Sequence, residues 1–165
     1  MTTTGDETQR EHRPRAGGRR RTVARLAAVQ ALYQLELNPA LEPDAAVREF
    51  ARYRFDQEID GDQLAEADPA FFADIVRGVA AERERLDADI SGVLVADWPL
   101  SRLDAVLRAI LRAGAWELAQ RPDVPPRVSI SEYIAIAHAF FAGKEPGLAN
   151  GVLDRLGRNW RAADM

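Results

Sequence analysis

Apolar residues recur every three or four positions along most of the chain, which is the spacing of an amphipathic α-helix. The pattern is clearest over residues 19–37, and the Asn38-Pro39 pair ends it. Its apolar positions share one broad face: Val23, Leu26, Ala27, Val29, Leu32, Tyr33 and Leu35. We therefore predict a first helix over this segment.

The same period predicts further helices, each bounded by proline or glycine. We expect these helices over residues 44–55, 69 to about 94, 101 to before 122, 129–142, and about 146–156. The second of them either continues throughout or ends and begins again near residue 86. No long segment alternates apolar and polar residues with the period of a strand, and no fixed repeat is visible. The prediction is an all-α protein of about seven helices.

Several local motifs predict where the helices begin. Asp68 followed by Pro69 is typical of an N-cap with proline at the first helical position. Ser101-x-x-Asp104 and Ser129-x-x-Glu132 have the spacing of capping boxes. The Asn150-Gly151 pair falls inside a helical period, so we expect a close contact between helices there rather than a turn.

Charge divides the chain into two unequal parts. The net charge is −4, but residues 1–25 hold seven arginines against three acidic residues, or +4, and the remainder carries −8. Residues 1–18 lack apolar periodicity and contain Pro14, Gly17 and Gly18, so we predict a disordered basic tail followed by one helical domain over residues 19–160. An acidic body with a basic arm indicates a polyanionic partner at one end.

Arg19, Arg20 and Arg21 begin the first helix, and Arg25 follows Arg21 by one turn, on the same face. Cations at a helix N-terminus oppose the helix dipole at a small cost in free energy, which indicates that a partner outside the fold compensates them. A phosphate backbone would do so, and single-stranded RNA suits an arginine-rich arm. The competing interpretation is that the arginines only solubilise the helix start.

Two more polar side chains follow on the same helix. Gln30 and Tyr33 offer hydrogen bonds to base edges and a ring for stacking if they are exposed. For Tyr33 the alternative is a place in the core.

The sequence contains no signature of catalysis, of a cofactor or of a metal site. Cysteine is absent, and the two histidines, His12 and His138, have no neighbours at ligand spacing. The segment GKEPG around Lys144 lacks the pattern of a phosphate loop. Without a signal peptide or an apolar span of about 18 residues, we expect a non-enzymatic, cytoplasmic protein that does not enter membranes.

Four segments in order resemble the NusB family of bacterial transcription antitermination factors: RRRTVARLAAVQALYQLE, LRAILRAGAWEL, PDVPPRVSISEYIAIAHAF and LANGVLD. The resemblance covers about residues 19–156. It implies two packed three-helix bundles and binding to the boxA element of nascent ribosomal-RNA transcripts. The implied partners are NusE, a small-subunit ribosomal protein, and an antitermination complex with RNA polymerase that reads through terminators.

The resemblance also implies which residues bind RNA. The family's arginine-rich segment corresponds to Arg19, Arg20, Arg21 and Arg25, and its VQALY segment contains Gln30 and Tyr33. The loop before the last helix lies near the RNA in this family. Lys144 stands there where relatives can have an acidic residue, so we expect it to strengthen phosphate contact.

Other interpretations remain open at this stage. One is a helical adaptor whose acidic body binds a basic ribosomal protein without specific RNA binding. Another, the N-terminal domain of an RsmB-like methyltransferase, would require a following cofactor domain and a catalytic cysteine, and the absence of cysteine argues against it. Family members occur as monomers and as dimers, so a homodimer is one of two expected states.

Overall fold

The structure, a computed structural model, describes residues 16–54 and 67–165, and these contain six α-helices and no strand. The expected all-α fold is confirmed. The helices are α1 (Ala16–Leu37), α2 (Pro43–Glu49), α3 (Pro69–Val93), α4 (Ala105–Gln120), α5 (Pro126–Phe140) and α6 (Glu145–Trp160). A π-helical segment (Phe50–Arg54) extends α2, and two 3₁₀ turns (Leu100–Arg102 and Ala162–Asp164) precede α4 and follow α6.

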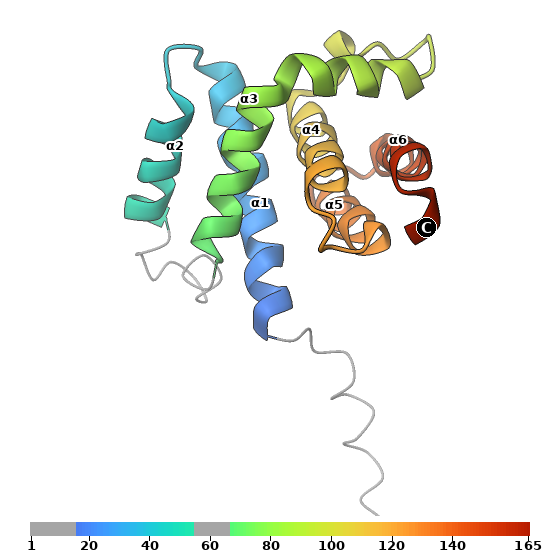
Figure 1. Ribbon diagram of the computed structural model, residues 1–165. Helices are drawn as coiled ribbons and strands as arrows, with labels where there is room; N and C mark the ends of the chain where they lie inside the picture. Colours follow the sequence, from blue (N-terminus) through green and yellow to red (C-terminus); the bar gives the residue numbers. More distant parts are fainter. Residues whose placement is uncertain (1–15, 55–66) are drawn as a thin grey trace, which may run out of the picture.

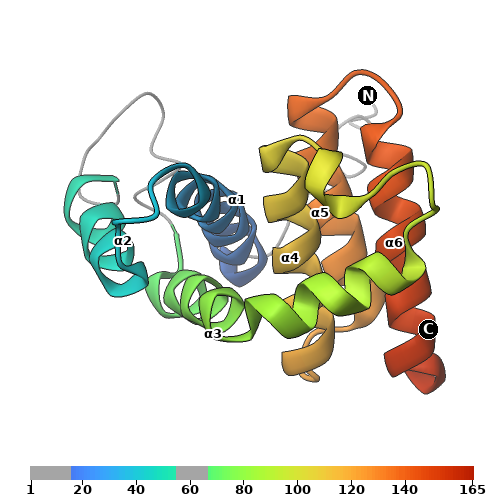
Figure 2. The same cartoon turned by 90° about the horizontal axis from the view of Figure 1, so that it is seen from above.

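The helices form two bundles joined by α3. Contacts link α1, α2 and α3 in one bundle and α4, α5 and α6 in the other (Figure 1). Seen from above, α3 runs beneath both groups, so its second half packs beside α4 and α6 (Figure 2). The helix is continuous except at Glu82, where φ is −113° and ψ is 18°. This kink lets one helix serve both bundles.

Small side chains allow α1 to pack closely against α3 and α4. Four of its alanines are completely buried: Ala24, Ala27, Ala28 and Ala31. Buried residues from all six α-helices meet in one cluster, with large side chains such as Phe72, Ile110 and Leu153 at its centre. Burial of this apolar surface supplies the main stabilising free energy of the fold.

An ion network fixes the C-terminal end of α1. Glu36 accepts a hydrogen bond from Arg112 at 3.2 Å and one from Arg108, and Arg112 also donates to Asp87 at 2.7 Å. These residues come from α1, α4 and α3, so the network ties the two bundles together.

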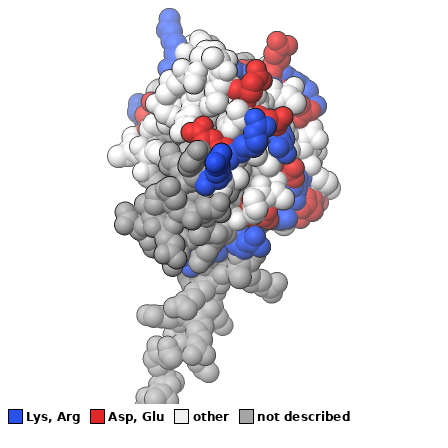
Figure 3. Space-filling model, turned by 90° about the vertical axis from the view of Figure 1, so that its left-hand side faces the viewer, with Lys and Arg blue, Asp and Glu red and all other residues white. Residues whose placement is uncertain are grey.

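The described part of the face on which α2 lies carries mixed charge. Figure 3 shows basic and acidic side chains interspersed over the face where α2 lies, without a continuous patch of either sign. Within the described residues, no helix combines the length and the apolar content needed to cross a membrane.

One predicted helix start is confirmed, and the first helix begins earlier than expected. The Asp68 side chain accepts a hydrogen bond from the Phe71 N–H at 3.0 Å, with Pro69 in the first turn of α3. Helix α1 begins at Ala16 instead of Arg19, because no proline lies between Pro14 and Pro39 and the Gly17-Gly18 pair is accommodated within the helix. The rest of the predicted tail, residues 1–15, lies outside the described residues, as does the end of the second predicted helix at residue 55.

Both predicted capping boxes are wrong. Ser101 lies in a 3₁₀ turn that buries Leu100, and the N-cap of α4 is Asp104, whose side chain accepts from the Val106 N–H at 2.8 Å. Helix α5 begins at Pro126, so Ser129 lies inside it and is buried. Proline is well suited to the first turn of a helix because its fixed φ is helical and its missing N–H has no partner there.

The close contact between helices that we predicted at Asn150-Gly151 is not there, and two other glycines, Gly78 and Gly114, make such contacts instead. The Asn150-Gly151 pair does lie inside α6, but Gly151 is exposed and a Cβ there would meet nothing within 4 Å. A Cβ on Gly78 of α3 would instead stand 2.1 Å from Nε1 of Trp116 on α4, and one on Gly114 would stand 2.9 Å from Leu153. Gly78 therefore makes room for the Trp116 ring between α3 and α4.

We predict that Gly78→Ala destabilises the protein by about 1–3 kcal/mol, because the added methyl group overlaps a buried indole ring. The matched control is Gly151→Ala, which removes glycine from an exposed helical position and should be neutral or stabilise by up to about 1 kcal/mol. Urea denaturation followed by circular dichroism measures both. Equal effects of the two substitutions would contradict the packing at Gly78.

Candidate nucleic-acid interface

A surface depression of about 480 Å³ lies beside the first turns of α1, where the two bundles meet. We call it the α1 pocket. Its walls come from α1, from the start of α3, and from the α4–α5 loop with the beginning of α5: Gly18, Arg20, Arg21, Arg25, Asp68, Asp123, Val124, Pro125, Val128 and Glu132. Three of the four predicted arginines therefore line one site.

The arginines at the start of α1 differ in how open they are. Arg20 is exposed and makes no side-chain hydrogen bond or ion pair with any described residue. Arg21 is 36% exposed in its side chain, and its Nη1 lies 3.8 Å from Asp123. Arg19 is exposed and does not line the pocket. Arg20 and Arg21 thus present positive charge to solvent at the pocket.

Arg25 has a different environment from Arg20 and Arg21, and its role as a direct RNA contact stays a prediction. Only 2% of its side chain is exposed, and its Nε donates to Glu117 Oε1 at 2.9 Å. Its Nη1 lies 3.6 Å from Glu132. Burial raises the pKa of Glu117, and the Arg25 charge opposes that rise. A guanidinium so enclosed by two carboxylates stabilises the wall of the pocket, whereas Arg20 and Arg21 are more open to solvent.

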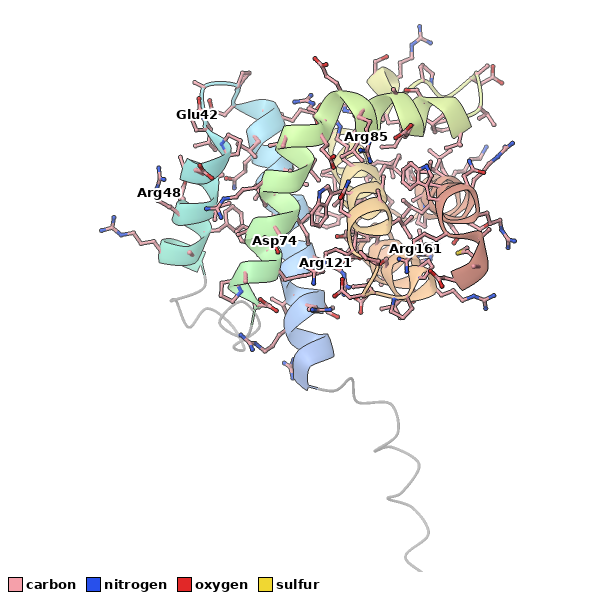
Figure 4. The ribbon with its side chains drawn as sticks, in the orientation of Figure 1. Glu42, Arg48, Asp74, Arg85, Arg121 and Arg161 are labelled. Carbon is pink, nitrogen blue, oxygen red and sulfur yellow. The ribbon has the colours of Figure 1, made fainter. Side chains whose placement is uncertain are left out.

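The ring of Phe71 organises three guanidinium groups. Those of Arg21, Arg25 and Arg121 lie 4.9, 5.0 and 5.0 Å from the ring centroid. The predicted shared face of Arg21 and Arg25 is confirmed by this contact. Arg121 reaches the ring from the end of α4, beside Asp74 of α3 (Figure 4). Cation–π attraction to Phe71 offsets part of the repulsion among the three cations.

The α4–α5 loop forms the opposite wall and is held at both ends. Arg121 donates to both carboxylate oxygens of Asp123, each at 2.9 Å, and these hydrogen bonds lower the pKa of Asp123 to about 2. Arg161, beyond the end of α6, donates to the carbonyls of Val124 at 2.7 Å and Pro122 at 3.2 Å. Asp123 is therefore ionised and fixed in position at neutral pH.

Glu132 connects α5 to the first turns of α1. Its Oε1 accepts a hydrogen bond from Thr22 Oγ1 at 2.9 Å, and the same hydroxyl lies 2.9 Å from the Gly18 carbonyl. On the α3 side, the Asp68 N–H donates to the Arg20 carbonyl at 3.1 Å. Both contacts hold the start of α1 against the rest of the pocket.

The remaining predicted residues lie outside the α1 pocket. Gln30 and Tyr33 are half-buried, and helical periodicity places them on the same stripe of α1 as Arg19. Lys144 is exposed just before α6 and makes no side-chain hydrogen bond or ion pair with the described residues. A role in RNA binding for these three residues stays a prediction.

The sequence analysis did not assign Asp68, Asp123 or Glu132 to the pocket, and it did not identify Phe71 and Arg121, which contact the residues that line it. The sequence does contain a sign of the Arg25–Glu117 ion pair. Glu117 is a charged residue inside the apolar run AGAWEL, and Arg25 is a charged residue on an otherwise apolar helix face, so each needs a buried partner of opposite charge. Within the described residues, no group of three or more histidine, cysteine or acidic side chains could hold a metal ion.

Together, the fold and this site define an all-helical protein of two three-helix bundles, with an arginine-lined pocket where the bundles meet. The NusB family model matches residues 22–158. The chain belongs to the NusB family.

Individual relatives agree with this assignment. The transcription antitermination protein NusB of Caulobacter vibrioides is 52% identical over 141 residues, which are 86% of this chain and 94% of that protein. The protein of the same name from Brucella anthropi is 55% identical over 139 residues, 83% of this chain and 81% of that protein. The solved structure of T. maritima NusB has a TM-score of 0.67 and 27% identity, covering 84% of this chain and 90% of that one.

We predict that Arg25→Met lowers the free energy of unfolding by about 3–5 kcal/mol, because Glu117 is left buried without its partner. Adding Glu117→Gln should recover part of this loss, since the buried charge is then removed. Urea denaturation of the two single variants and the double variant measures the coupling. Strictly additive effects would show that the pair does not stabilise the start of α1.

Proposed function

We propose that the protein is a transcription antitermination factor that binds the boxA element of nascent ribosomal-RNA transcripts together with NusE, and so supports read-through by RNA polymerase. The observation that carries the proposal is the open guanidinium of Arg20 beside Arg21 at the α1 pocket. The family relationship supports it, since the relatives compared above are transcription antitermination proteins.

The geometry favours a single-stranded ligand over a duplex. The pocket is a small depression between helices, with a volume of about 480 Å³. Splayed nucleotides can enter such depressions, whereas a duplex presents only its backbone and groove edges. Arg20 and Arg21 would neutralise phosphates at the pocket and Arg19 would do so on the neighbouring surface of α1, and each neutralised phosphate releases counterions.

The competing proposal is an adaptor that binds NusE through the acidic body alone. The two proposals differ in what the basic arm does. Titration of labelled boxA RNA and a scrambled RNA, with and without NusE, at two salt concentrations separates them. Preference for boxA in any condition supports the first proposal, and equal affinity throughout contradicts it.

We predict that Arg20→Ala weakens binding to boxA RNA and lowers the slope of log affinity against log salt by about 1, because one phosphate contact is lost. Arg155→Ala is the matched control, since Arg155 is also exposed on a helix, without a partner among the described residues, and does not line the α1 pocket. The control should leave both quantities unchanged. A chain beginning at Thr22 should lose most RNA binding and retain NusE binding.

Lys144 supplies a separate test at the loop before α6. We predict that Lys144→Glu reduces boxA affinity at low salt and lowers the salt slope by about 1–2, because an attractive charge becomes a repulsive one. Fluorescence anisotropy across a salt series measures both quantities. Unchanged affinity and slope would remove Lys144 from the RNA-binding surface and leave the α1 pocket unaffected.

A further inference from the structure

The α1 pocket contains as many carboxylates as arginines. Asp68, Asp123 and Glu132 line it together with Arg20, Arg21 and Arg25. A site for phosphate alone gains nothing from three carboxylates, because they repel the ligand. The pocket therefore has the composition of a site that also binds hydrogen-bond donors.

Two of these carboxylates are already engaged by the protein. Asp123 receives hydrogen bonds from Arg121 on both oxygens, and Glu132 receives one from Thr22 and lies beside Arg25. Engaged in this way, they hold the walls of the pocket in place.

Asp68 has one uncommitted oxygen. Its Oδ1 accepts the Phe71 N–H at 3.0 Å as the N-cap of α3, and its Oδ2 has no hydrogen bond to any described residue. Its backbone N–H is fixed by the Arg20 carbonyl at 3.1 Å. Because the cap and this contact fix the position of the residue, Oδ2 is a preorganised acceptor at the pocket.

The α4–α5 side of the pocket offers an apolar surface. Val124, Pro125 and Val128 line it, and Val128 is 43% exposed although it is a large hydrophobic residue. A base can lay its face against such a surface while its edge meets polar groups. The volume of about 480 Å³ falls within the range of small-ligand sites.

We propose that the α1 pocket holds one nucleotide of the bound RNA and that Asp68 Oδ2 accepts a hydrogen bond from an exocyclic amino group of its base. Cytosine, adenine and guanine carry such a group and uracil does not, and carboxylates accept from the cytosine amino group in known readout. Arg20 and Arg21 bind the adjoining phosphates. This inference rests on the proposed function. It adds that the nucleotide in the α1 pocket carries a base with an exocyclic amino group.

The test replaces each amino-bearing base of a boxA RNA, one at a time, by its analogue without that group. Pyrimidin-2-one replaces cytosine, purine replaces adenine and hypoxanthine replaces guanine. For the unmodified protein, one position should lose roughly tenfold in affinity, which corresponds to one hydrogen bond to a charged group. In Asp68→Ser the same replacement should have no effect at that position.

The serine variant is chosen because serine also caps helices, so α3 retains its N-cap while the free oxygen is lost. Asp104→Ser is the matched control: Asp104 is the N-cap of α4, it does not line the α1 pocket, and the change in charge is the same. It should bind all RNAs in the series with the selectivity of the unmodified protein. Asp68→Asn, which also keeps the cap, provides a second variant in which selectivity should fall.

The outcomes separate this inference from the proposed function. If no position is sensitive to loss of the amino group, or if the sensitivity survives in Asp68→Ser, base reading by Asp68 is wrong while boxA binding stands. If boxA and scrambled RNA bind equally, the proposed function fails and this inference fails with it.

Discussion

The buried ion pair between Arg25 and Glu117 determines how the first helix sits on the rest of the protein. Two charges removed from water are costly unless the geometry and the surrounding hydrogen bonds compensate for them. Here Glu132 and the Phe71 ring supply that compensation, from α5 and α3. Because Arg25 is held in the interior, the rotation of α1 about its axis is fixed, and Arg20 and Arg21 reach the α1 pocket one turn earlier.

This arrangement makes the proposed binding of RNA compatible with a net acidic protein. The pocket balances three arginines with three carboxylates, so long-range charge attraction comes mainly from the arginines that remain open. Electrostatic attraction of that kind does not distinguish sequences. Carboxylates, an apolar wall and a loop clamped by Arg121 and Arg161 provide the fixed geometry that selectivity requires.

The sequence predicts the helices better than the site, because helices depend on local information. The spacing of apolar residues and the prolines at 39, 69, 99 and 122 predict most helix ends to within a few residues of where the structure has them. Ser101 and Ser129 were wrongly predicted as N-caps because another residue near each of them starts the helix. Asp104 caps α4 while Leu100 is buried in the preceding turn, and Pro126 starts α5 so that Ser129 is buried inside it. The burial of Arg25 could not be predicted from the sequence, because its partner Glu117 lies 92 residues away and only the fold brings the two together. The Arg20 and Arg21 positions followed from the sequence, whereas the opposite wall of the pocket did not.

The most direct test of this account is hydrogen–deuterium exchange of the full chain with and without boxA RNA, resolved by peptide. Bound RNA should slow exchange in the first turns of α1 and in the peptides containing Asp68 and residues 121–132, which together form the α1 pocket. The account predicts this protection while exchange over α2 stays unchanged. Protection concentrated on α2, with the start of α1 unaffected, would contradict it.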